Sequence, residues 1–145
     1  MAILNYTTQI DVYKTVAEIE RMLSEHGVMS IMKQYEDGQI VSLSFLIDDG
    51  EKKIPVRMPI RVNECLKVMQ KQKEEHPRMQ IKATKEQASK VAWRIMKDWI
   101  EVQMALLEIN MVRFEEIFLP YIETADGKTI YEKLEDRKFL LEWFL

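Results

Sequence analysis

"TKEQASKVAWRIMKDWIEVQMALLEINM", residues 84–111, decides the predicted fold because it is the longest helical pattern in the chain. Thr84 and Gln87 have the T-x-x-Q spacing of a capping box, which predicts that a helix begins here. Apolar residues of near-heptad spacing form a first row along this helix: Ala88, Ala92, Ile95, Trp99, Val102, Leu106 and Ile109. A second apolar row flanks the first. Only a narrow polar band remains, so the stretch predicts a central helix, roughly residues 85–110, that is covered on most sides.

Upstream of this helix, apolar residues alternate with polar ones, which is the period of a β-strand. Three such runs lie between Val28 and Ile60. The Asp37-Gly38 pair between the first two runs is a signal for a two-residue hairpin turn. Pro55 and Pro59 in the third run indicate an edge strand, because proline cannot donate to a sheet ladder. The pattern predicts a three-stranded antiparallel meander with one apolar face.

Helices are predicted on both sides of the meander. Asp11 and Asn63 can each cap one, and Thr129 opens a second capping box for a C-terminal helix. Residues 2–7 weakly suggest a short strand, and residues 114–122 a short helix or turn. We therefore expect an α+β fold: a three-stranded antiparallel meander packed against a long central helix, with N- and C-terminal helices, in a single domain over residues 1–145.

Composition narrows the classes of protein to which the chain can belong. Of its 145 residues, 47% are hydrophobic and 31% are charged, which is ordinary for a globular domain. No apolar run approaches the ~18 residues of a membrane span, and the first residues lack the pattern of a signal peptide. Cys65 is the single cysteine, which excludes an internal disulfide. We expect a cytoplasmic protein with no membrane contact.

Catalytic and metal-binding motifs are not found in the sequence. His26 and His76 have no metal-ligand spacing, and Cys65 has no histidine near it in the sequence to act as a base. The "GKT" at residues 127–129 lacks the earlier glycine of a phosphate-binding loop, because Ile122 stands there. We expect no catalytic residue, no metal and no cofactor, and predict that the protein is not an enzyme.

Charge is distributed unevenly along the chain. Residues 1–51 have a formal balance of -6, residues 52–97 of +9 and residues 98–145 of -6. Such a basic segment predicts a surface for nucleic acid or another phosphate-rich anion, with candidate residues Lys53, Arg57, Arg61, Lys67, Lys71, Arg78 and Lys82. The alternative is that the segment docks against the acidic ends of the same chain or of a second copy. The only aromatic residue in it, Trp93, can serve either for base stacking or as core.

The end of the chain, "KFLLEWFL", residues 138–145, carries more large apolar groups than one helical turn can bury. Either these groups fill the core or they meet a partner. The second reading predicts a protein-interaction surface at Phe139, Leu140, Trp143 and Phe144. It also predicts a homodimer.

Several segments resemble a family of small uncharacterised proteins of bacteriophages and bacterial integrative elements. The resemblance is carried by "VAWRIMKDWIEVQMALLEINMVRFEEIFLPYI" (residues 91–122), "GKTIYE" (127–132), "ILNYTT" (3–8) and the meander. It implies an accessory protein of a mobile element, acting in the host cytoplasm. Such a protein would bind nucleic acid, or would bind and block a host protein or sequester a nucleotide signal. No catalytic or binding residue comes with the resemblance.

Overall fold

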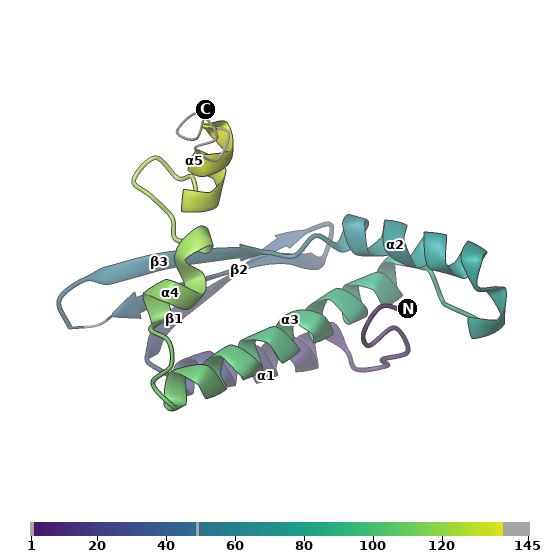
Figure 1. Ribbon diagram of the computed structural model, residues 1–145, viewed down its shortest axis with the longest axis horizontal. Helices are drawn as coiled ribbons and strands as arrows, with labels where there is room; N and C mark the ends of the chain where they lie inside the picture. Colours follow the sequence, from purple (N-terminus) through teal and green to yellow (C-terminus); the bar gives the residue numbers. More distant parts are fainter. Residues whose placement is uncertain (1, 49, 138–145) are drawn as a thin grey trace. The chain divides into compact units, whose positions relative to one another are not determined.

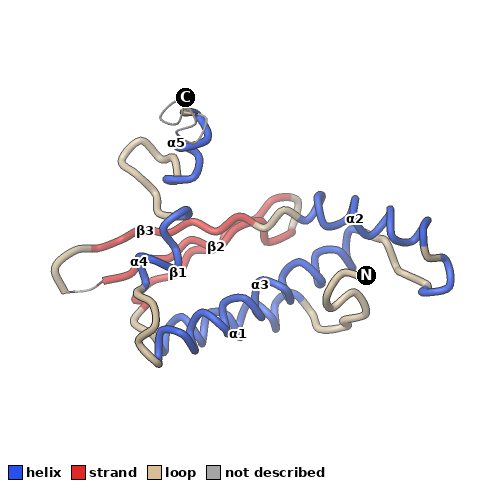
Figure 2. Tube along the Cα trace, viewed as in Figure 1, coloured by secondary structure: helices blue, strands red, loops and turns tan. Residues whose placement is uncertain are grey.

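The computed structural model describes residues 2–48 and 50–137. It has the α+β fold that the sequence predicts (Figures 1 and 2). The elements are α1 (Val12–Glu25), β1 (Val28–Glu36), β2 (Gln39–Asp48), β3 (Lys53–Pro59), α2 (Val62–Glu75), η1 (Pro77–Met79), α3 (Lys85–Glu108), α4 (Phe114–Phe118), η2 (Leu119–Tyr121) and α5 (Ile130–Asp136). The chain divides into two compact units: the first contains residues 1–25 and 60–105, and the second contains residues 26–59 and 106–145.

The sheet of the second unit is the predicted antiparallel meander, in the order β1-β2-β3. Asp37 and Gly38 both have positive φ, 52° and 76°, as the predicted hairpin turn requires. At the centre of the sheet Phe45 pairs with Ile31 of β1 and with Val56 of β3. The ring of Phe118 meets the Phe45 ring edge-on, with centroids 5.1 Å apart. The apolar face is therefore buried in part by α4.

The two edges of this sheet differ. β3 is an edge strand, as its prolines predict, but the chain after η2 covers part of its outer side. Ile122 forms a bridge with Val56, and the Glu123 N–H donates to the Pro55 carbonyl at 2.9 Å. Among the residues that the structure describes, β1 pairs with β2 alone.

The first unit is helical. In α1, Val16, Ile19 and Leu23 are buried on one side of the helix, and Met69 of α2 and Trp93 of α3 are fully buried. Trp93 is thus a core residue, which leaves it no face for base stacking.

The helix α3 has close to the predicted length, but the face predicted to be buried is partly wrong. Val102 and Ile109 of the predicted apolar row are 57% and 63% exposed, whereas Ile100 and Met104 are buried. The physical reason is that a heptad row drifts around a straight α-helix by about 20° per heptad. With two apolar rows available, the sequence does not decide which one faces inward.

The predicted strand at residues 2–7 is wrong: residues 4–7 form a turn in which Asn5 has a φ of 62°. Side chains of α3 hold this segment. The Gln87 amide donates to the carbonyls of Tyr6 and Thr8 at 3.1 and 2.8 Å, and Asp98 accepts from the Asn5 amide at 2.9 Å. The first capping box is therefore half formed, since Thr84 caps the Gln87 N–H while the Gln87 side chain is used elsewhere.

The other three predicted helix starts differ in outcome. Asp11 lies directly before α1, and its carboxylate accepts from the Tyr13 N–H at 2.8 Å. Asn63 is not a cap, because α2 already begins at Val62. At α5 the capping box is complete. The Thr129 hydroxyl accepts from the Glu132 N–H, and the Glu132 carboxylate accepts from the Thr129 N–H.

Candidate anion-binding surface

The seven predicted anion-binding residues fall into both units. Lys53 and Arg57 lie on β3 in the second unit. The other five belong to the first unit and lie on or next to α2 and η1: Arg61, Lys67, Lys71, Arg78 and Lys82. The predicted protein-interaction residues Phe139, Leu140, Trp143 and Phe144 lie outside the described residues.

Arg57 is engaged by carboxylates of its own chain. Its Nε lies 2.7 Å from Glu123 Oε1 and its Nη2 lies 2.7 Å from Glu132 Oε1. Burial lowers the pKa of Arg57, but the hydrogen bonds to both glutamates outweigh it, so the pKa of Arg57 is raised. The pKa of Glu132 is lowered, first by hydrogen bonds from Thr129 and then by Arg57. Arg57 therefore joins β3 to the segment that follows η2 and to α5, and is not available to an external phosphate.

Lys67 and Lys71 lie on the exposed side of α2, each beside a glutamate of the same helix. The Lys67 amine lies 3.3 Å from Glu64 and the Lys71 amine 3.9 Å from Glu75. All four side chains are more than half exposed. Pairs of this kind contribute about 0–1 kcal/mol and exchange readily. Lys67 and Lys71 are partly neutralised, yet an anion that offers a better partner can recruit them.

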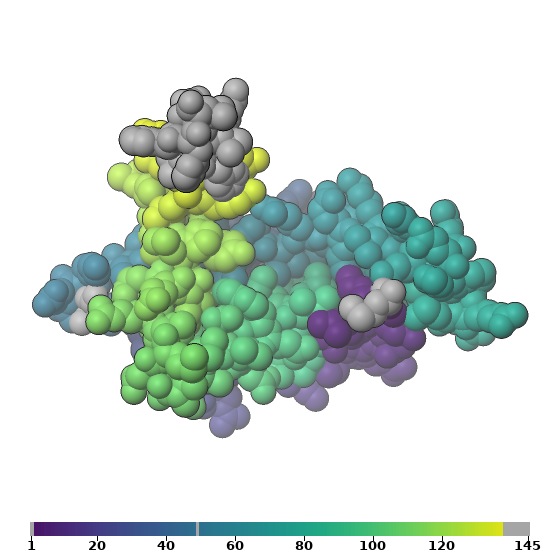
Figure 3. All heavy atoms as spheres, in the orientation of Figure 1, coloured from purple at the N-terminus to yellow at the C-terminus, as the bar shows by residue number. Residues whose placement is uncertain are grey.

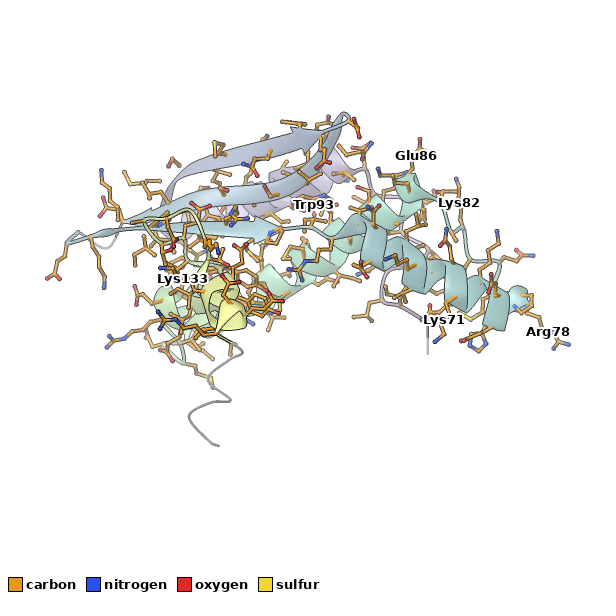
Figure 4. The ribbon with its side chains drawn as sticks, turned by 90° about the horizontal axis from the view of Figure 1, so that it is seen from above. Lys71, Arg78, Lys82, Glu86, Trp93 and Lys133 are labelled. Carbon is orange, nitrogen blue, oxygen red and sulfur yellow. The ribbon has the colours of Figure 1, made fainter. Side chains whose placement is uncertain are left out.

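Five further cations around α2 form no ion pair among the described residues. They are Arg61, Lys73, Arg78, Lys82 and Lys85, and all of them are exposed. We call these five residues, together with Lys67 and Lys71, the α2 basic surface. In Figure 4, Lys71 and Arg78 lie on one side of α2, and Lys82 lies near Glu86 on the other. In Figure 3 the teal region of the chain is convex on the side shown. The cations of this surface are therefore spread over more than one side of α2.

Folding cancels much of the charge asymmetry along the chain. The first unit contains twelve basic and ten acidic residues, and the second contains nine and fourteen, so that their balances are +2 and -5. Arg94 does not form a pair with Asp98 four residues later; it contacts Glu18 of α1 at 2.5 Å. Lys97 pairs with Glu101 within α3. Part of the basic segment thus faces the acidic N-terminal segment. The α2 basic surface remains open, as does the exposed Lys53 of β3, which forms no ion pair among the described residues.

The two histidines and the cysteine each have their own surroundings in the structure. His26 Nε2 lies 2.8 Å from Glu108 Oε1, and His76 is exposed. Burial raises the pKa of the Cys65 thiol, and its sulfur lies 3.9 Å from that of Met69. Among the described residues no three side chains of the histidine, cysteine, aspartate or glutamate type come together in a way that could hold a metal ion.

A pocket of about 370 Å³ opens in the second unit where β1 begins. Its charged lining is mixed, with His26 and Arg113 beside Asp48 and Glu115. A lining that contains both positive and negative side chains favours neither an anion nor a cation. The pocket does not add to the anion-binding surface.

No helix within residues 2–48 and 50–137 has both the length and the apolar character needed to cross a membrane. Comparison of the chain with models of protein families, with curated proteins and with solved structures finds no match.

Proposed function

We propose that this protein is a non-enzymatic binding protein that holds a nucleic acid, or another phosphate-rich anion, on the α2 basic surface. The observation that carries the proposal is the group of five exposed cations around α2 and η1 that form no ion pair within the described part of the chain. An anionic polymer is a partner that can engage cations spread along and around a helix, since its charges are repeated along its length.

The arrangement of these cations favours contacts to the phosphate backbone. Lys67 and Lys71 stand one helical turn apart, about 6 Å along the axis, and Arg78 continues on the side of Lys71. Phosphate contacts of this kind position a nucleic acid but do not read its sequence. Because Trp93 is buried, it offers no platform for stacked bases. We therefore expect binding that depends strongly on salt and little on sequence.

The test is the affinity of the full chain for labelled single- and double-stranded nucleic acid, measured by fluorescence anisotropy between about 50 and 200 mM salt. The variant combines Lys73→Ala, Arg78→Ala and Lys82→Ala. Its control carries the same change of charge on exposed residues elsewhere: Lys14→Ala, Arg21→Ala and Arg137→Ala.

We expect the α2 variant to bind more weakly and the slope of log K against log salt to become shallower by about 2 to 3, which is ~0.7–0.9 per lost contact. The control variant should keep most of the slope. The proposal fails if the parent chain does not bind at about 50 mM salt, or if both variants lose affinity equally.

A protein partner is the second candidate, favoured by exposed apolar side chains of the second unit, at Met29, Met32, Tyr35, Ile109 and Met111. Such side chains are typical of adaptable docking surfaces. A role as a phage-type accessory protein in the host cytoplasm, acting on a host protein or a nucleotide signal, stays a prediction. A pull-down from a bacterial lysate, compared between the parent chain and Met29→Lys, tests it; equal recovery of every bound protein would exclude this surface.

A further inference from the structure

The edge strand β1 presents an open pairing edge. It is nine residues long and contains no proline, and among the described residues it pairs with β2 alone. An open edge of this kind offers unpaired N–H and C=O groups as a template for another strand, and proteins usually block such edges with prolines, charges or covering segments. β3 has such protection in its two prolines and its covering segment. β1 has neither.

The side chains of β1 carry no net charge, and three of its large apolar side chains are exposed. Met29, Met32 and Tyr35 are each more than half exposed, and Lys33 and Glu36 are the only charged residues of the strand. Irregularities interrupt its register with β2 between Val28 and Ser30 and between Gln34 and Tyr35. The regular stretch is therefore residues 30–34, and Met32 is its central residue.

We propose that β1 pairs with β1 of a second copy of this chain, antiparallel, about a two-fold axis at Met32. This register pairs all nine residues of both strands. Residues that are directly opposed point to the same side of the joined sheet. It places Lys33 opposite Ile31 of the second copy, so that no like charges are directly opposed. Moving the axis by one residue to Lys33 would place the two lysines against each other. The positions of the charged residues therefore favour the axis at Met32, which is also the centre of the regular stretch, residues 30–34.

The size of this contact sets the expected strength of the dimer. Nine residues at ~3.4 Å per residue give a length of about 31 Å, and a sheet thickness of ~10 Å then gives about 300 Å² per copy. A standard stable interface buries about 800 Å² per partner. The apolar surface continues past the strand, because the His26–Glu108 contact brings the turn with Ile109 and Met111 to the start of β1. We expect a concentration-dependent equilibrium between monomer and dimer.

The first experiment is sedimentation velocity of the full chain over a wide range of concentration, for the parent, Met32→Lys and Val102→Lys. Met32 and Val102 are both 57% exposed, so the two substitutions add the same charge at equal exposure. Met32→Lys places two cations together on the axis and should shift the equilibrium at least tenfold toward monomer, whereas Val102→Lys should not. A parent that stays monomeric throughout, or a dimer that survives Met32→Lys, overturns the proposal.

The second experiment tests the register by disulfide formation in a Cys65→Ser background. Met32→Cys places a thiol directly opposite its symmetry mate and should form a disulfide between copies on mild oxidation. Ser30→Cys is the matched control, because residue 30 faces residue 34 of the second copy. The two introduced thiols are then about 14 Å apart along the strands, beyond disulfide reach. Equal cross-linking of both variants, or of neither, overturns the register. If Met32→Lys abolishes capture of a lysate protein but the parent forms no dimer, the occupant of the edge is a foreign strand and the second copy is excluded.

Discussion

Substitution of Gln87 tests the structure of the first unit, because the capping motif in the sequence and the contacts in the structure predict opposite changes in stability. In Gln87→Glu the motif becomes T-x-x-E, which keeps the capping box and adds a negative charge in the first helical turn, so the sequence alone predicts a more stable helix start. In the structure, however, the Gln87 side chain is 8% exposed and its amide donates to the carbonyls of Tyr6 and Thr8. A carboxylate at this position cannot donate and would face two acceptor oxygens.

The expected loss of stability in Gln87→Glu follows from the two lost hydrogen bonds. Each contributes about 1 kcal/mol net, and burial of an unpaired charge adds to the loss, so we expect the free energy of unfolding to fall by about 2–3 kcal/mol at neutral pH. For a chain of this length that is a fall in Tm of about 5–10 °C. The deficit should shrink near pH 4, where the introduced carboxylate takes up a proton. The assay is urea and thermal unfolding, with Gln70→Glu on the exposed side of α2 as control. If Gln87→Glu is as stable as the parent or more so, the anchoring of residues 6–8 is wrong.

Three further outcomes are expected. The buried Ser89 hydroxyl has no hydrogen-bond partner among the residues that the structure describes, so Ser89→Ala should raise the free energy of unfolding by about 1 kcal/mol in urea titrations. A loss of stability would mean that the hydroxyl is bonded in solution. Arg57→Met removes both carboxylate contacts and should make amide hydrogen exchange in residues 122–136 several-fold faster, whereas unchanged exchange, or an equal effect of Lys53→Met, would contradict the role of Arg57. The pKa of Asp126 is lowered from 3.8 to about 2, chiefly by a hydrogen bond from Thr124. Because the pKa is lower in the folded chain than in the unfolded chain, the contribution of Asp126 to stability is present above about pH 4 and is lost toward pH 2. An NMR titration of Asp126 with an ordinary midpoint would refute this prediction.

The elements that the sequence predicted correctly are those with local signals. The turn at Asp37-Gly38, the prolines of β3 and the capping box at Thr129 each determine structure within a few residues, and all three are found in the structure. Residues 2–7 could not be predicted in this way. Their turn is held by Gln87 and Asp98, which are 79 to 93 positions away from the groups they contact.

The same distinction applies to the candidate site. The pairs of Lys67 and Lys71 with glutamates three and four residues away follow from helical spacing. The sequence could not show that Arg57 is engaged, because its partners are 66 and 75 residues further along the chain. Counting charges identified the basic segment, but only the fold separates the cations used within the chain from those that remain exposed.

The unequal edges of the sheet also limit how large an assembly can become. A sheet with two open edges can add copies at both sides without end, which is the geometry of a fibril. Here the outer side of β3 is blocked by its prolines and by the bridge from Ile122. Association through β1 would therefore consume the open edge of each copy, and the sheet of the described residues has no second open edge for a third. The arrangement allows a closed pair and opposes filament growth, so that an unprotected strand can persist at the surface without seeding aggregation through this sheet.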